Sequence, residues 1–110
     1  MSNPDRELLQ GTLDLLILKA VSATPMHAWG LTQRIREMSR EVLSVNPGSL
    51  YPALERLQDR GWIEPRWGVT ENNRRAKFYQ LTASGRKRLE VETEAWRRLV
   101  VGVNAVLRTT

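Results

Sequence analysis

Residues 46–61 read Asn46-Pro47-Gly48-Ser49-Leu50-Tyr51-Pro52-Ala53-Leu54-Glu55-Arg56-Leu57-Gln58-Asp59-Arg60-Gly61 and predict one short helix with marked ends. Asn46 suits the N-cap, because its side-chain oxygen can accept a hydrogen bond from a free amide of the first turn. Pro47 suits the first helical position, and Gly61 is typical of a helix end. Pro52 leaves the start open, because a helix that begins at Pro47 loses a backbone hydrogen bond there, whereas one that begins near Ser49 does not.

This helix has two different faces. Leu50, Leu54 and Leu57 recur at steps of four and three, so they share one face and are expected in the core. The opposite face carries Ser49, Tyr51, Pro52, Glu55, Arg56 and Gln58. Arg56 has two interpretations: its guanidinium can fork onto a guanine base, or it can pair with Glu55 or Asp59 on a solvated face.

The composition limits the possible functions. A chain of 110 residues forms one domain, and dimerisation would help it to bury enough surface. There is no cysteine and a single histidine, and no glycine-rich phosphate loop is present, which argues against an enzyme and gives no reason to expect a metal or a cofactor. The polar N-terminus is unlike a signal peptide, and the longest apolar run near it, residues 15–18, is far too short to span a membrane. A cytoplasmic protein is expected.

Positive charge is concentrated directly after the predicted helix. The net charge of the whole chain is +5, whereas residues 60–88 contain eight basic and two acidic side chains, a net of +6. A local basic stripe favours a polyanionic partner such as nucleic acid. The alternative is a solvated surface that keeps the protein soluble.

Two helices are predicted before residue 46. The first covers Leu8 to Val21 and is apolar on nearly all sides, so it needs a second cover, which a partner subunit can supply. A buried strand at residues 15–18 is the alternative. The second runs from His27 or Ala28 to Glu41, with Ala28, Leu31, Ile35 and Met38 on one face. His27 has no second ligand nearby, so a capping or packing role is expected instead of metal binding.

A β-hairpin is predicted after Gly61. Ile63, Pro65, Trp67 and Val69 alternate with other side chains, and Pro65 requires a free strand edge. Residues 70–73 form the turn, and residues 76–81 return as the second strand. Arg74, Arg75 and Lys77 then lie at or near the tip, where they can contact phosphates; an ordinary exposed turn is the alternative.

Thr82 begins a last helix that runs to about Leu107. Its apolar residues recur at steps of seven, which is typical of helices that pair with another helix. We therefore expect a homodimer, with the first helix of the partner also in contact. The residues assigned to this interface are Leu8, Leu15, Leu89, Trp96, Leu99, Val103 and Val106.

The sequence also resembles the PadR family of bacterial transcriptional regulators. The matching segments are residues 9–18, 26–31, 48–54 and 79–85, together with Leu57 and Gly61. Two departures are the His27-Ala28-Trp29 segment, where the family usually has His-Gly-Tyr, and a chain that stops after one C-terminal helix, as in a short subgroup.

The resemblance implies a mainly α fold with a small β-hairpin (α+β), a winged helix-turn-helix with three helices, a two-stranded wing and a C-terminal dimerisation helix. Residues 1–85 would be the DNA-binding domain and residues 86–110 the dimerisation helix. The implied function is a homodimeric repressor that binds double-stranded DNA at an inverted-repeat operator. The residues assigned to DNA are Ser49, Tyr51, Pro52, Arg56, Arg74, Arg75 and Lys77.

Two further hypotheses remain open. A winged-helix protein-interaction module that does not bind DNA is the alternative function, but it has no need of the basic stripe. Trp96, in the middle of the pairing helix, can line a pocket for a planar aromatic effector, or it can simply be part of the interface core.

Overall fold

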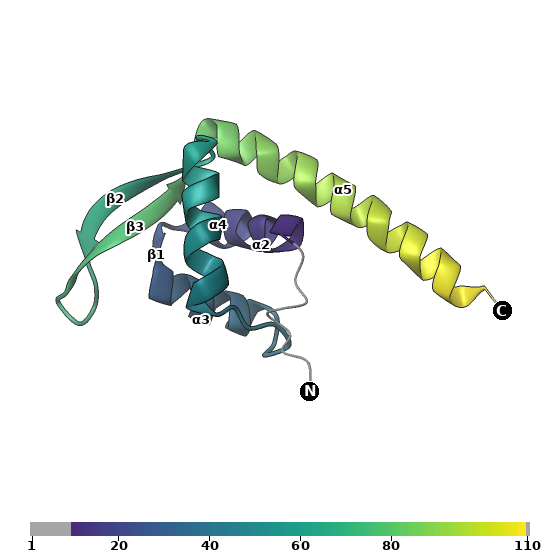
Figure 1. Ribbon diagram of the computed structural model, residues 1–110, viewed down its shortest axis with the longest axis horizontal. Coiled ribbons are helices and arrows are strands. Elements are labelled where there is room, and N and C mark those ends of the chain that lie inside the picture. The colour runs from purple at the N-terminus through teal and green to yellow at the C-terminus, as the bar shows by residue number, and fades with distance from the viewer. Residues whose placement is uncertain (1–9, 110) are drawn as a thin grey trace.

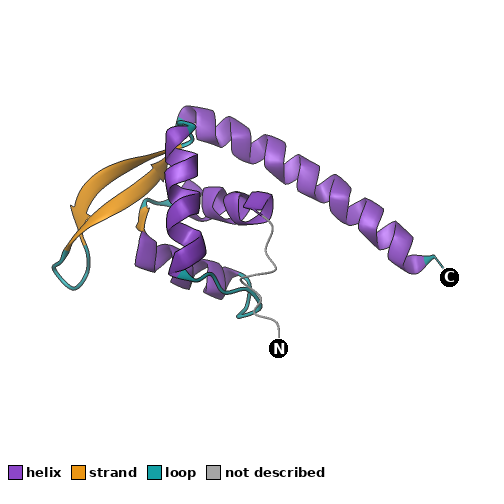
Figure 2. Ribbon diagram, in the orientation of Figure 1, coloured by secondary structure: helices purple, strands orange, loops and turns teal. Residues whose placement is uncertain are grey.

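In residues 10–109, the computed structural model has four helices and a three-stranded antiparallel sheet (Figures 1 and 2). The helices pack around one core, the strands form a wing on one side, and the last helix extends away on the other side. Among the helices described, none is long and apolar enough to cross a membrane. In chain order the elements are α2 (Gln10–Ala23), β1 (Met26–His27), α3 (Ala28–Met38), α4 (Pro47–Asp59), β2 (Ile63–Val69), β3 (Arg75–Leu81) and α5 (Ala83–Arg108).

Helix α4 begins and ends as its sequence predicts. The side chain of Asn46 accepts a hydrogen bond from the Ser49 amide at 2.9 Å, and Pro47 is the first helical residue. Pro52 therefore lies inside the helix, which decides between the two starts left open above. Gly61 has a φ of +75°, the left-handed conformation that favours glycine after a helix end.

The core forms where α2, α3 and α4 meet the base of the sheet. The three leucines of α4 each expose 1% of their surface or less, so the predicted apolar face is confirmed. Fully burying a side chain of this size contributes about 1.5–3 kcal/mol relative to leaving it exposed. The largest fully buried side chains are Ile17, Leu18, Leu31, Leu50, Leu54, Leu57 and Ile63.

Helix α2 is confirmed as a helix, which excludes a strand at residues 15–18. Its residues Leu13, Ile17, Leu18 and Val21 are buried within the chain itself. Leu15 and Leu16 are only half-buried, so part of the apolar surface of α2 stays uncovered in the single chain. Leu8, assigned to the dimer interface from the sequence, lies outside the described residues.

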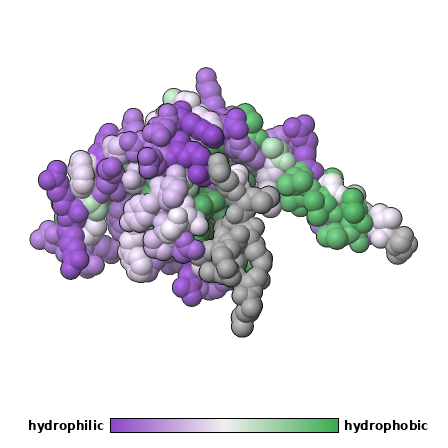
Figure 3. Space-filling view, in the orientation of Figure 1, coloured by the Kyte–Doolittle hydropathy of each residue, from purple (hydrophilic) through white to green (hydrophobic). Residues whose placement is uncertain are grey.

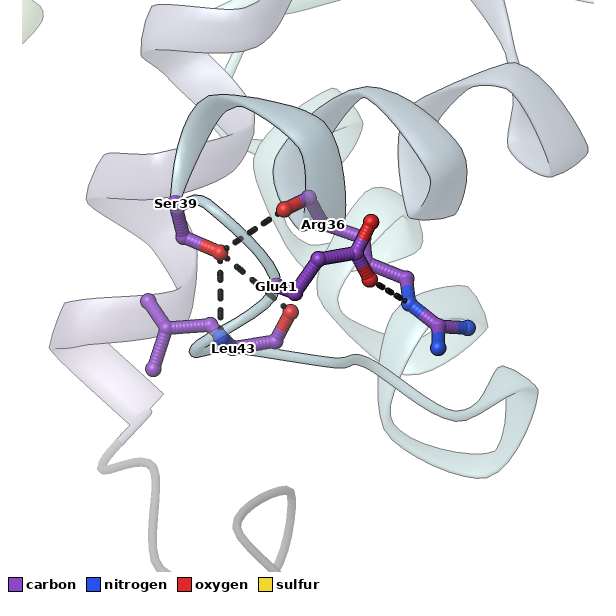
Figure 4. A network of polar contacts seen from close by, with 4 residues as sticks. All are labelled: Arg36, Ser39, Glu41 and Leu43. Carbon is purple, nitrogen blue, oxygen red and sulfur yellow. Dashed lines mark hydrogen bonds and ion pairs between the residues drawn. The ribbon is translucent and has the colours of Figure 1, made fainter.

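Helix α3 ends three residues earlier than predicted. The last helical residue is Met38, and Arg40 and Glu41 both have positive φ values, of 55° and 68°. The Ser39 hydroxyl donates to the Arg36 carbonyl at 3.1 Å and accepts from the Leu43 amide at 3.0 Å (Figure 4). Arg36 also pairs with Glu41, so local polar contacts hold the reversal between α3 and α4.

The short strand β1 was not predicted. Met26 and His27 pair with Tyr79 and Phe78 of β3, so the sheet has the order β1-β3-β2 instead of being a two-stranded wing. Two residues are too few to show an alternating pattern. His27 takes the predicted capping role, because its Nδ1 accepts a hydrogen bond from the Gly30 amide at 3.1 Å and its ring meets Phe78 edge-on.

The hairpin has the two strands, the turn and the free edge that the sequence predicts, and β3 begins one residue earlier, at Arg75. Strand β2 pairs only with β3, so Pro65 lies in an edge strand as predicted. Asn73, with a φ of +61°, takes the left-handed position of the turn. Only the base of the hairpin reaches the core, since Ile63 is buried whereas Trp67 and Val69 are 58% and 62% exposed.

Helix α5 starts against the end of α4. Thr82 caps it, as predicted, by accepting from the Gly85 amide at 2.9 Å, and its hydroxyl donates to the Gly61 carbonyl at 2.6 Å. The first turns pack on α2 and β3, and the helix then runs clear of the body (Figure 1). Its C-terminal half therefore presents hydrophobic surface (Figure 3).

We predict that Gly85→Ala destabilises the fold by about 1–3 kcal/mol or more, because overpacking costs that much in a rigid setting. A Cβ on Gly85 would come within 1.9 Å of the Trp62 carbonyl oxygen. Gly102→Ala is the matched control in the same helix: its Cβ would have no neighbour within 4 Å, so it should stabilise by about 0.5–1 kcal/mol. Thermal unfolding followed by circular dichroism compares them, and an unchanged midpoint for Gly85→Ala would contradict the packing.

Candidate nucleic-acid interface

A groove of about 440 Å³ lies between the wing and the N-terminal ends of α3 and α4. Four of the residues predicted to contact DNA line it: Tyr51 from α4 and Arg74, Arg75 and Lys77 from the wing. Tyr51 is at least 23 positions away from the three wing residues in the sequence. The fold therefore brings together two segments that were assigned to DNA separately. The wing beside the groove is strongly hydrophilic (Figure 3).

The outward face of α4 is set by its buried leucines. Because Leu50 and Leu54 point into the core, Tyr51 and Pro52 are directed outward; both are exposed, Tyr51 by 57%. Ser49 is half-buried near the helix start. The exposed front thus offers a phenol, a proline ring and, at its edge, a hydroxyl.

A second tyrosine lies behind the groove. Tyr79 of β3 is 8% exposed, and burial, with a smaller contribution from Tyr51, raises the pKa of its phenol above the ordinary value of 10.0. Tyr79 and Tyr51 both line the groove.

The wing cations are free to meet an anion. The guanidinium of Arg75 lies 4.7 Å from the ring centre of Trp67, which orders the side chain without neutralising it. The Arg74 amide donates to the Thr70 hydroxyl, and the Thr70 amide donates to the Arg74 carbonyl, so the turn itself is closed. Across the described part of the chain, the ion pairs involve none of Arg74, Arg75 and Lys77. Three basic side chains and one acidic side chain, Glu71, line the groove, and a net positive charge beside an exposed helix is typical of a nucleic-acid interface.

Comparison with known proteins identifies the family of the chain. The family model described as the transcriptional regulator PadR-like family matches residues 17–91, which include the second half of α2, helices α3 and α4, the wing and the start of α5. The chain belongs to the PadR-like family of transcriptional regulators. Membership implies DNA binding, and the family is one of regulators, not of enzymes.

Relatives of this PadR-like chain are similar in sequence and in structure. A transcriptional regulator of Mycobacterium tuberculosis is 33% identical over 94 residues, which cover 86% of this chain and 84% of that protein. A PadR-like transcriptional regulator from Bacillus cereus has a TM-score of 0.78 at 25% identity, covering 93% of this chain and 97% of that chain. A PadR family regulator from Clostridium difficile has a TM-score of 0.75 at 25% identity, covering 86% and 97%. The winged-helix architecture expected from the resemblance is confirmed.

Arg56 does not face the groove. Its guanidinium is turned toward α2, where Nε donates to Asp14 Oδ2 at 3.3 Å and Nη2 donates to Asp14 Oδ1. The partner of Arg56 is therefore Asp14 and not Glu55 or Asp59. The partner lies 42 residues away in the sequence, so no local pattern could have identified it.

Trp29 is a groove residue that the sequence analysis did not assign to DNA. It lies in the first turn of α3, is 69% exposed, and lines the groove beside Tyr51. Its position opposite the buried Leu31 on the helical repeat is the signal that could have found it, because an exposed tryptophan on a polar helix face indicates a contact surface.

The residues assigned to the dimer interface divide into two groups. Leu89 packs partly against the chain's own core, and Leu15 is half-buried. Trp96, Leu99, Val103 and Val106 are 42%, 55%, 47% and 72% exposed along α5. Leu15, Trp96 and Leu99 also line a hollow of about 250 Å³ between α2 and α5.

Proposed function

We propose that this PadR-like protein is a homodimeric cytoplasmic repressor that places α4 in the major groove of an inverted-repeat operator and the wing on the adjacent backbone. The single observation that carries the proposal is the convergence of Tyr51, on the front of α4, and the wing cations Arg74, Arg75 and Lys77 on one groove. The major groove, about 12 Å wide, admits one α-helix, and phosphates alongside it are within reach of a flanking hairpin.

In this arrangement the two elements have different tasks. Ser49, Tyr51 and Pro52 meet the edges of the bases or the sugar next to them, and so contribute sequence preference. Arg74, Arg75 and Lys77 contact phosphates, which contributes affinity for any sequence. Arg56 is left out of the base-reading set because its guanidinium is paired with Asp14 of α2.

The proposed dimer rests on the uncovered side of α5. Leu99, Val103 and Val106 recur at the helical repeat and are all exposed, so they form a contiguous apolar strip on one side of α5. A contiguous exposed apolar strip, unlike a single exposed apolar side chain, indicates an interaction surface. A second copy of the chain covers this strip most economically, with the exposed part of Leu15 at its edge. Two α4 helices related by a twofold axis then require two half-sites about one helical turn of DNA, or a multiple of it, apart.

A second proposal concerns regulation. The hollow beside Trp96 has an apolar wall of Leu15 and Leu99 and is bounded by the small residues Gly11 and Ala95. A planar aromatic effector fits the chemistry of such a site, since a flat ring can stack on the indole. A role of Trp96 as interface core alone is the alternative.

Footprinting on the DNA upstream of the protein's own gene tests the proposed function. We expect a protected site made of two inverted half-sites whose centres are about 10 base pairs apart, or a multiple of that distance. A protected site without twofold symmetry would contradict the dimer geometry, and no binding to any DNA would favour the protein-interaction module.

Replacing both Arg74 and Arg75 by Ala should weaken binding to operator and unrelated DNA alike. Each lost phosphate contact lowers the slope of log affinity against log salt by about 0.9, so the double variant should lose about 1.8. Arg97→Ala with Arg98→Ala is the matched control, because it removes the same charge from exposed positions on α5. Fluorescence anisotropy over a range of salt concentrations measures the slopes; equal slopes for the two double variants would exclude the wing contacts.

Val103→Glu should convert the dimer to a monomer, because it places a charge in the proposed apolar interface. Val101→Glu is a close control: Val101 is two residues away in the same helix and is 67% exposed, but it lies off the strip that contains Leu99 and Val103. Sedimentation equilibrium gives the mass of each. A monomeric Val101→Glu variant together with a dimeric Val103→Glu variant would place the interface on the opposite side of α5.

A further inference from the structure

We infer that Asp14 and Arg56 form a positioning pair that holds α4 at the rotation in which Tyr51 faces the groove, so that Arg56 supports DNA reading without touching DNA. This inference rests on the proposed function, since it assumes that the front of α4 meets the bases.

The pair joins two helices through a buried contact. Asp14 lies in the first half of α2 and is 7% exposed; it is the only buried charged side chain in the part of the chain that the structure describes, residues 10–109. The side chains of Arg56 and Asp14 are 23% and 10% exposed, and two guanidinium nitrogens meet the two carboxylate oxygens. Such a fork fixes direction as well as distance, because both groups are planar.

The position of Arg56 on α4 links its pairing with Asp14 to the placement of Tyr51. At about 100° per residue, Arg56 and Tyr51 lie on opposite flanks of the buried leucine face, each about 100–120° from Leu50. Arg56 therefore anchors the flank next to α2, while Tyr51 occupies the flank next to the wing. Any rotation of α4 about its axis that separates the fork also moves Tyr51 in the groove.

The leucines alone do not specify this rotation as closely. Hydrophobic burial is non-directional, so Leu50, Leu54 and Leu57 fix which face of α4 is inside but tolerate small rotations about the axis. A buried ion pair is weak support for stability, because the cost of removing both charges from water offsets much of their attraction. Its expected contribution here is to the rotation of α4 about its axis. Operator affinity is sensitive to this rotation, whereas the free energy of unfolding does not report it.

A double-mutant cycle tests the pair. The variants are Asp14→Asn, Arg56→Gln and the double variant, each measured for operator affinity and for affinity to unrelated DNA of equal length. Asp59→Asn and Arg97→Gln are the matched controls, because they make the same charge changes at exposed positions. All measurements are made at a temperature at which circular dichroism finds every variant fully folded.

We expect each single variant to lose about tenfold or more in operator affinity relative to its charge-matched control, a change equivalent to about 1.4 kcal/mol. Affinity for unrelated DNA should match the control. The double variant should be no worse than either single variant, because both substitutions remove one interaction.

Two results would overturn the inference. If Arg56 reads a base directly, Asp14→Asn leaves operator affinity equal to or higher than that of Asp59→Asn, and Arg56→Gln remains harmful in the Asp14→Asn background. If the pair is only structural, the folded variants bind the operator as their controls do. Should Asp14→Asn or Arg56→Gln not fold, Arg56→Lys retains the charge and loses the fork; it should bind the operator more weakly than wild type, and wild-type affinity would contradict positioning.

The experiment distinguishes failure of the positioning role from failure of the proposed function. If the wild-type protein binds no operator, the DNA-reading proposal is wrong. If the wild type binds its operator and the pair variants behave as their controls do, only the positioning role is wrong.

Discussion

Burial of the leucine face of α4 is the constraint on which the rest of the structure depends. With Leu50, Leu54 and Leu57 under α2 and α3, the helix has one flank against α2 and the other against the wing. The exposed groups of α4 are those that this packing leaves outside. The proposed DNA surface is thus a consequence of core packing, because burial of one face of an amphipathic helix leaves the opposite face exposed.

The elements that could be predicted from the sequence are those with local signals. Asn46, Gly61 and Thr82 mark helix ends through contacts with residues a few positions away, and the structure has all three in these roles. The edge position of β2 followed from Pro65 alone. The wing arginines could be placed near the turn because they directly follow the turn residues, and the turn fixes how the two strands of a hairpin pair.

The features that could not be predicted depend on long-range contacts or on very short segments. Strand β1 has two residues and exists only because β3 lies beside it. The early end of α3 depends on Arg40 and Glu41 accepting left-handed conformations, which neither residue type favours by itself. The fork between Arg56 and Asp14 joins residues 42 positions apart, so sequence reasoning could see an arginine on a polar face but not the acid that turns it away from solvent.

One contact point joins the proposed DNA-binding part to the last helix. The end of α4, the start of β2 and the cap of α5 meet at Trp62, whose carbonyl accepts from the Thr82 amide and whose ring lies close to the guanidinium groups of Arg60 and Arg88. From there α5 continues for 26 residues without interruption, a length of about 39 Å at 1.5 Å per residue. At this length, a tilt of about 10° at Trp62 would displace the far end of α5 by about 7 Å. In the proposed dimer, the close packing of Gly85 against the Trp62 carbonyl would accordingly set the distance between the α4 helices of the two subunits.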